Sequence, residues 1–211
     1  MVLSAKGDFG EAERLQREAL GIKRELLGDE HADMALNFHN LAAVLAAKGE
    51  YDGAERLLRE ALAIQRKTFG KEHPNVAMIL NGLAQVLDAK GEYAEAERLH
   101  REALAIQRKT FAEAHPDVAA SLNSLAVVLA RKGNYGEAEG LLREALAIRR
   151  KTLGEEHHYV AASLHDLGAL LNNKGDFDGA ERLLREALAI RRKTLGGEHP
   201  DVATSLNNLA S

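Results

Sequence analysis

The sequence predicts an all-α protein, a solenoid in which pairs of antiparallel helices repeat along the chain. The first observation is a fixed period. A glycine followed two positions later by an aromatic residue recurs every 42 positions, at Gly7, Gly49, Gly91, Gly133 and Gly175. The second observation is composition: the apolar residues are mainly Ala and Leu, with no Trp and only three Pro, which favours helices over strands. A period of about 20 to 50 residues is typical of repeat arrays.

We therefore expect a single repeat array over residues 1–211. Five periods of 42 residues account for 210 of the 211 positions, which leaves no room for a separate domain. The chain would then start in the closing turns of one helix and stop midway through another, with partial helices at both ends. Because a repeat buries its apolar face only against its neighbours, we expect exposed apolar faces at Leu20 with Ile22 and at Leu206 with Leu209. This pattern suggests a fragment of a larger protein.

Each repeat begins with a helix, expected in the second repeat over residues 51–67. The preceding glycine can adopt the left-handed conformation that ends a helix. The residue after it starts the next helix, and this column holds Asp8, Glu50, Glu92, Asn134 and Asp176. Asp8 with Glu11, and Asn134 with Glu137, have the spacing of a capping box. Apolar residues then follow at spacings of three and four, which predicts one apolar helix face: Ala54, Leu57, Leu58, Ala61, Leu62 and Ile64.

The opposite face of this helix repeats a glutamate followed four residues later by an arginine. This is the favourable order for an ion pair on an exposed helix surface: Glu13 with Arg17, Glu55 with Arg59, Glu97 with Arg101, Glu139 with Arg143, and Glu181 with Arg185. The helix ends in basic clusters such as Arg66–Lys67 and Arg149–Lys151. These clusters either complement the negative end of the helix dipole or form an anion site.

A connector leads from this helix to the second helix of the repeat, expected over residues 74–90. Pro74, Pro116 and Pro200 each follow a histidine and precede a new apolar period, and proline suits the first turn of a helix. Two repeats depart from this pattern: Ala112 replaces the connector glycine, and His158–Tyr159 replaces Pro-Asp. We expect a slightly altered turn in each place.

Five histidines share one connector position: His31, His73, His115, His157 and His199. A metal site needs three or four ligands that converge within a few ångströms, whereas stacked helices lie about 10 Å apart. We therefore expect these histidines to cap or pack the connector. His157, His158 and His165 form a local cluster, but it lacks the spacing and the carboxylate of an H-E-x-x-H site, so no metal and no cofactor is expected.

Charge and composition argue against several classes of function. The net charge is only −4 with interleaved signs, so the sequence shows no nucleic-acid or membrane footprint. The chain has no Cys, no long apolar run and no signal-type N-terminus, which fits a cytoplasmic protein. Ser121, Ser163 and Ser205 lie in phase with the repeat and have no triad pattern or nucleophile elbow, so we expect no enzymatic activity.

The repeat residues together resemble the tetratricopeptide repeat family. Gly49, Tyr51, Ala54 and Ala61 have that family's relative spacings, and a small residue lies where the two helices would cross, at Ala42, Ala84, Ala126 and Gly168. The 42-residue period, the L-N-N-L-A run that starts at Leu206 and the A-L-A-I-x-[RQ]-K-T-[LF]-G-x-E-H-P-D-V-A run are similar to the kinesin light chain type of repeat. The resemblance covers the whole chain. Because repeats of this type also occur in bacterial multi-repeat proteins, the resemblance and the high similarity between units suggest a bacterial or consensus-like array, part of a larger multi-domain protein.

The resemblance implies a right-handed superhelix whose concave side is lined by the second helix of each repeat. In the kinesin light chain family, the Asn of the L-N-x-L-A motif contacts the backbone of an extended cargo peptide. That column here holds Asn81, Asn123 and Asn207, and departs from the family at His39 and His165. Other residues expected on the concave face are Leu36, Met78, Gln85, Asp88, Arg131, Asn172 and Asn173. The alternative is that the Asn column bridges neighbouring helices or caps local backbone.

Two functions remain open from the sequence. In the first, the concave groove binds an extended peptide segment of a partner protein, because a carboxamide can satisfy both the N–H and the C=O of a passing chain. In the second, the array is a structural spacer, or a scaffold that associates with itself head to tail. The residues do not identify the partner.

Overall fold

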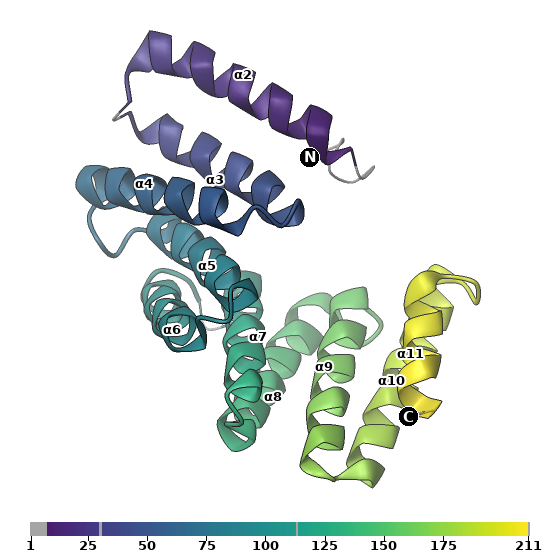
Figure 1. Ribbon diagram of the computed structural model, residues 1–211. Coiled ribbons are helices and arrows are strands. Elements are labelled where there is room, and N and C mark those ends of the chain that lie inside the picture. The colour runs from purple at the N-terminus through teal and green to yellow at the C-terminus, as the bar shows by residue number, and fades with distance from the viewer. Residues whose placement is uncertain (1–7, 30, 113, 211) are drawn as a thin grey trace. The chain divides into compact units, whose positions relative to one another are not determined.

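The computed structural model describes residues 8–29, 31–112 and 114–210, and ten α-helices make up most of these residues (Figure 1). Gly7 and the partial helix expected before it lie outside the described residues. The chain divides into two compact units, Met1–Thr110 and Phe111–Ser211. Unit 1 contains α2 (Phe9–Leu27), α3 (Ala32–Ala47), α4 (Tyr51–Phe69), α5 (Pro74–Ala89) and α6 (Tyr93–Thr110). Unit 2 contains α7 (Pro116–Arg131), α8 (Tyr135–Leu153), α9 (His158–Lys174), α10 (Phe177–Leu195) and α11 (Pro200–Ala210).

Within each unit, helices that follow one another in the chain pack side by side. In unit 1 the contacts run from α2 to α3 and onward to α6, and α3 also touches α5. The helices of unit 2 pack in the same order, from α7 to α11. The predicted all-α array of helix pairs is therefore confirmed, with the odd-numbered helices α3, α5, α7 and α9 as the shorter members of each pair.

The shorter helices end in left-handed glycines, as predicted. Gly49 has φ 81°, and the next amide, Glu50 N–H, donates to the carbonyl of Leu45 at 2.9 Å. This is the bond of a Schellman motif, which satisfies a carbonyl left open at the helix end. Gly91, Gly133 and Gly175 have φ values of 82° to 85°.

The connector histidines cap the shorter helices. The Nδ1 atom of each accepts a hydrogen bond from the backbone N–H two residues later at 3.2 Å, and the five donors are Asp33, Asn75, Asp117, Tyr159 and Asp201. The predicted capping role is thus confirmed. Nδ1 must be unprotonated to accept, so each of these imidazoles carries its proton on Nε2 when neutral.

The two irregular connectors behave differently from each other. Where Ala112 replaces glycine, α6 ends at Thr110, while α4 runs one position further to Phe69. No described residue other than glycine has a positive φ, so alanine cannot copy the usual turn, and the altered turn is confirmed here. At His158–Tyr159 the prediction was wrong. His157 caps α9 with the same φ and ψ as its counterparts, because many residues besides proline accept the first helical position.

Caps on the longer helices follow side-chain charge and length. Asp8 accepts from Glu11 N–H at 3.1 Å, and Asp176 accepts from Gly179 N–H at 3.0 Å. Asn134 makes no side-chain cap bond, so the capping box predicted there was wrong. Glu50 makes none either, so the side chains that cap in these repeats are the short carboxylates Asp8 and Asp176.

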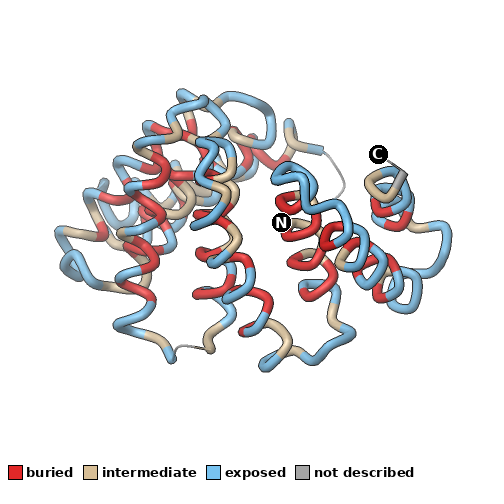
Figure 2. Tube along the Cα trace, turned by 90° about the horizontal axis from the view of Figure 1, so that it is seen from below, coloured by how far each residue is buried: buried red, intermediate tan, exposed pale blue. Residues whose placement is uncertain are grey.

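Small residues mark the helix crossings, as expected. Ala42, Ala84 and Ala126 are completely buried, and buried residues line the helix sides that face their neighbours (Figure 2). At Gly168 the approach is closer still, since a Cβ there would lie 2.8 Å from Leu184 Cγ. The absence of a side chain at Gly168 therefore brings α9 and α10 together.

Three of the five glutamates expected on an exposed face are buried, which corrects the sequence interpretation for them, whereas Glu139 is half-buried and Glu181 is exposed. Glu55 is only 7% exposed, and Glu13 and Glu97 are also buried. Glu55 pairs with Arg59, as predicted, but it also accepts from Lys90 Nζ at 2.6 Å. Lys48 pairs in the same way with Glu13, and Lys174 with Glu139. In these three repeats the lysine at the end of the following short helix thus pairs with the carboxylate, a contact that spacing along one helix does not reveal.

Basic residues at the ends of the longer helices also have acidic partners. Arg66 pairs with Glu102 on α6, and Arg150 pairs with Glu186 on α10. Arg149 donates to the Ser163 hydroxyl. The Arg66 and Arg150 pairs therefore link successive longer helices, and Arg149 links α8 to α9, in addition to the position of these residues at the negative ends of helix dipoles.

Candidate functional site

The residues predicted to contact a partner all lie on the shorter helices, α3 and α5 in unit 1 and α7, α9 and α11 in unit 2. Five side chains are exposed: Gln85, Arg131, Asn172, Asn173 and Asn207. Another five are half-buried: His39, Asn81, Asp88, Asn123 and His165. The apolar side chains of Leu36 on α3 and Met78 on α5 are exposed as well.

The Asn and His column forms a polar ladder between successive short helices of a unit. Each step joins a residue to the one 43 positions later. Asn123 Nδ2 donates to Asp166 Oδ2 at 3.0 Å, since 123 + 43 = 166. His165 Nε2 lies 3.1 Å from Asn208 Nδ2. The bridging alternative therefore describes real contacts of this column, which can coexist with contacts to a partner.

The first step of the ladder lacks its second member. The residue 43 positions after His39 is Gly82, and a Cβ built on Gly82 would lie 3.2 Å from His39 Nε2. His39 Nδ1 is buried and has no hydrogen-bond partner. Burial lowers the pKa of His39, so the imidazole is neutral near pH 7.

Asn81 is held by a buried histidine that the sequence reasoning missed. His100 on α6 is 1% exposed, and its Nδ1 donates to Asn81 Oδ1 at 2.9 Å, because a carboxamide oxygen only accepts. Burial lowers the pKa of His100 to about 4. The signal in the sequence was that His100 occupies the apolar position held by Leu58, Leu142 and Leu184.

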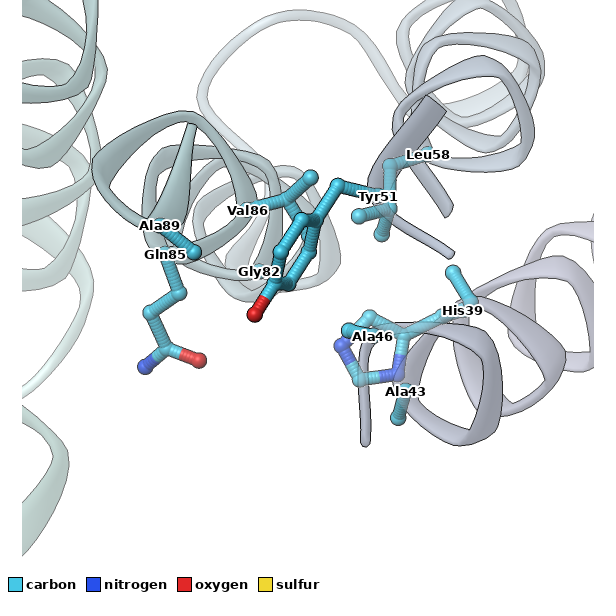
Figure 3. Close-up of a pocket in the computed structure, with 10 residues that line it drawn as sticks. His39, Ala43, Ala46, Tyr51, Leu58, Gly82, Gln85, Val86 and Ala89 are labelled. Carbon is cyan, nitrogen blue, oxygen red and sulfur yellow. The ribbon is translucent and has the colours of Figure 1, made fainter. Parts of the chain in front are cut away.

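A pocket of about 350 Å³ lies between α3, α4 and α5 in unit 1. Its walls are small or aliphatic: Ala42, Ala43, Ala46, Leu58, Gly82, Val86 and Ala89. Three polar side chains complete the lining, and Figure 3 shows the Tyr51 hydroxyl, the His39 ring and the Gln85 amide around the same open side. A partner's side chain could enter there while its backbone meets hydrogen-bonding groups at the rim.

A pocket of about 420 Å³ recurs at the same repeat phase in unit 2, between α7, α8 and α9. Nine of its ten lining residues are the counterparts, 84 positions later, of residues that line the unit 1 pocket; for example, 42 + 84 = 126 and 89 + 84 = 173. The chemistry differs between the two. Asp166 stands where unit 1 has Gly82, Asn173 stands where it has Ala89, and Arg131 joins the lining.

Of the predicted residues, the structure brings His39 and Gln85 to the first pocket and Arg131 and Asn173 to the second. Asn81, Asp88, Asn123, His165, Asn172 and Asn207 do not line either pocket. Sequence reasoning missed Tyr51, Tyr135 and Asp166 as site residues. The aromatic residue that recurs two positions after each glycine was the available signal for the tyrosines. Asp166 directly follows His165 of the Asn and His column, and no recurring pattern marked it.

Other classes of site find no support among residues 8–29, 31–112 and 114–210. No group of three or more His, Asp or Glu side chains in these ranges is arranged to hold a metal ion. His157, His158 and Tyr159 instead stack on one another, with ring centroids 4.1 to 5.4 Å apart. A search of the same residues found no helix long and apolar enough to cross a bilayer.

Comparison with known proteins identifies the repeat. The sequence profile of the family described as Tetratricopeptide repeat matches residues 1–62, 33–109, 117–193 and 166–211. No curated protein matches the chain. Nearly identical TPR-like repeats from a candidate kinesin light chain of Podosopora anserina, known from a crystal structure, are 34% identical over 92% of each chain, with a TM-score of 0.75.

Two further structures extend the comparison. BtubC (BKLC) from P. vanneervenii is 26% identical over 95% of this chain and 81% of its own, with a TM-score of 0.81. The apo form of RapI is 18% identical over 99% of this chain and 78% of its own, with a TM-score of 0.78, and it supports the fold alone. The chain therefore belongs to the tetratricopeptide repeat family, and its repeats are similar to those of kinesin light chain-like proteins.

Proposed function

We propose that this chain is a protein-interaction scaffold that binds an extended peptide segment of a partner protein. Tetratricopeptide repeats generally serve as protein-interaction modules. The observation that carries the finer proposal is the recurrence of one pocket, at the same repeat phase, beside the short helices of both units. Each unit thus offers a pocket of the same kind, and such a pocket can receive a side chain of an extended segment that lies along the short helices of that unit.

The proposed contacts combine pockets with exposed carboxamides. Gln85, Asn172, Asn173 and Asn207 are exposed, and each carries both a donor and an acceptor for a peptide backbone. Asn123 and Asn81 are half-buried; Asn123 donates to Asp166, and Asn81 accepts from His100. We propose that these two half-buried residues chiefly orient the surface, while the exposed residues and the pocket rims contact the peptide.

We further propose that the chain has no catalytic activity. The serines in phase with the repeat are buried, with Ser163 and Ser205 completely so. Arg149 donates to the Ser163 hydroxyl and Arg191 to the Ser205 hydroxyl, and a guanidinium, which stays protonated, cannot act as the general base that would activate a serine. The family's repeats are typically non-catalytic scaffolds.

A pocket-filling substitution tests the proposal. Linear peptides are first selected against the wild-type chain from a random display library, and affinities are then measured for Ala43→Phe. Ala43 is exposed at the pocket wall, so the added ring fills the opening without entering the core. Loss of about 1.5–3 kcal/mol of apolar contact corresponds to affinity weakened roughly tenfold or more.

The matched control is Ala63→Phe, an exposed alanine on α4 outside the pocket lining. It should bind the selected peptides as tightly as wild type. The proposal that the pocket binds a peptide would be wrong if the wild-type chain enriched no peptide, or if both variants bound the selected peptides equally well.

Exposed apolar residues also favour a second candidate, self-association. Ile22 on α2 is 55% exposed, whereas its counterpart Ile106 is 5% exposed. Leu206 on α11 is 42% exposed, whereas its counterpart Leu164 is fully buried. We propose that these faces of two copies meet head to tail. The molar mass of the wild type measured by light scattering should then rise with protein concentration, and that of Ile22→Glu should stay at the monomer value. A monomer mass at every concentration of the wild type would exclude this candidate.

A further inference from the structure

We propose that the unit 1 pocket is an anchoring site for one large uncharged apolar side chain of the partner peptide, such as Leu, Met or Phe, and that Gly82 keeps its wall free of a charged side chain. The inference rests on the proposed peptide-binding function and adds the chemistry of the residue that this pocket takes.

The first support is the missing ladder member. In unit 2, Asp166 lines the equivalent pocket and accepts from Asn123. In unit 1 the same two positions hold Gly82 and His39, and no side chain extends from Gly82. A Cβ built on Gly82 would lie only 3.2 Å from His39 Nε2 and 3.3 Å from Leu58 Cδ2, so the wall of the unit 1 pocket closes around glycine and carries no carboxylate where unit 2 has Asp166.

Charge distinguishes the two pockets. None of the ten residues that line the unit 1 pocket is a carboxylate, a lysine or an arginine, and burial keeps His39 in its neutral form by lowering its pKa. A charged side chain entering this site would lose hydration without gaining an opposite charge. The unit 2 pocket, lined by Asp166 and Arg131, offers polar partners instead.

The surface beside the unit 1 pocket is also apolar. Met78 precedes Gly82 by four positions on α5, and Leu36 precedes His39 by three on α3, so each lies one turn away on the same helix face. Both side chains are exposed. The counterparts of Leu36 and Met78 in unit 2 are Ala120 and Ala162. An apolar anchor residue with an apolar neighbour would thus match unit 1 better than unit 2.

The rim supplies the polar contacts that an extended backbone needs. The Tyr51 hydroxyl and the Gln85 amide stand at the open side of the pocket (Figure 3). A pocket of about 350 Å³ lies near the lower end of the range of roughly 300–1,000 Å³ for ligand sites, which suits one side chain. The occupant is accordingly a single anchor residue in an extended segment.

The test exchanges the residue that differs between the pockets. Peptides selected from a linear random display library against the wild-type chain should share a Leu, Met or Phe position, and replacing that residue by Ala should weaken binding roughly tenfold or more. Gly82→Asp, which gives unit 1 the residue found in unit 2, should weaken binding of the same peptides by at least as much. Gly10→Asp on α2 is the matched control, since Gly10 is exposed, has nothing within 4 Å of a Cβ position and lies outside the pocket lining, and it should leave binding of these peptides unchanged.

Three results separate the two proposals. No enrichment of any peptide by the wild-type chain would overturn peptide binding itself. Enrichment without a shared apolar position, or binding that Gly82→Asp leaves unchanged, would overturn the anchor site while peptide binding stands. Circular dichroism checks that Gly82→Asp remains folded; if it does not, Ala43→Phe decides the question, and undiminished binding of the apolar-anchored peptides by that variant overturns the anchor site.

Discussion

At the scale of single residues, His100 shows how a polar group is accommodated at a core position. Leu58, Leu142 and Leu184 hold the same position in other repeats. The imidazole is buried, and it donates to Asn81 across the contact between α5 and α6. An unpaired polar group in this position would be costly, so Asn81 and His100 depend on each other.

Burial of His100 predicts acid sensitivity. The pKa is about 4 in the folded chain, against 6.5 when exposed. Between these two values the unfolded chain binds a proton that the folded chain does not, so stability falls as pH drops from 6.5 to 4 and then levels off. The loss from this group is about 3 kcal/mol.

Urea unfolding at pH values across that window measures the effect, with His100→Leu as the comparison. His39 and His165, whose pKa values are also lowered, act in the same direction in both proteins. The pH dependence of His100→Leu should therefore be weaker than that of wild type. Identical pH profiles would show that His100 is not held neutral.

At the scale of the helix, two glycines make opposite predictions for the same substitution. Gly140 lies inside α8 with nothing within 4 Å of a Cβ position, so Gly140→Ala should stabilise the protein by about 0.5–1 kcal/mol through helix propensity. Gly168 lies inside α9, where a Cβ would press on Leu184 Cγ at 2.8 Å. Gly168→Ala should destabilise it, because overpacking costs about 1–3 kcal/mol.

Thermal melts of both variants test the packing between α9 and α10. The expected outcome is one shift upward and one shift downward relative to wild type. An upward shift for both would mean that α9 and α10 are less closely packed than described.

The lysine that ends α5 provides a third prediction. Lys90 bonds to Asp52 and to the buried Glu55, and these bonds raise the pKa of Lys90. Lys90→Met removes a partner of a buried carboxylate and should lower the urea midpoint, whereas Lys71→Met at the exposed α4–α5 connector should leave it nearly unchanged. Equal midpoints for the two variants would show that Arg59 alone satisfies Glu55.

The helices were predictable because their start and stop signals are local. The helix expected over 51–67 is observed at Tyr51–Phe69, and the helix expected over 74–90 at Pro74–Ala89. The glycine turns and the histidine caps involve residues within one or two turns of each other. Burial of Glu55 was not predictable in this way, since it depends on Lys90, which is 35 residues away.

The candidate site was predicted only in part. The sequence indicated which helices carry it and drew attention to His39, Gln85, Arg131 and Asn173, which line the pockets. The pocket walls are mostly alanine, leucine and valine, and such residues give no chemical signal in a sequence. The partners of Asn81 and Asn123 lie 19 and 43 residues away, so their engagement emerged only from the packing.

At the scale of the whole molecule, the unbroken 42-residue period leads us to propose one continuous repeat array over residues 1–211. Repeat stability is approximately a sum of repeat terms and nearest-neighbour interface terms. The full chain should therefore melt at a higher temperature than residues 1–110 alone, which hold one of the two compact units. Equal melting temperatures by calorimetry would mean that the two units are independent domains.

The central claim is that a partner peptide occupies the pocket that recurs in phase with the repeat. The most direct measurement is an NMR titration of the isotope-labelled chain with a peptide selected by display. If the peptide binds there, the largest chemical-shift changes of backbone amides should arise at Ala43, Tyr51, Gly82 and Gln85, and at counterparts such as Val127, Tyr135 and Asp166. Shifts confined to the longer helices, away from both pockets, would contradict it.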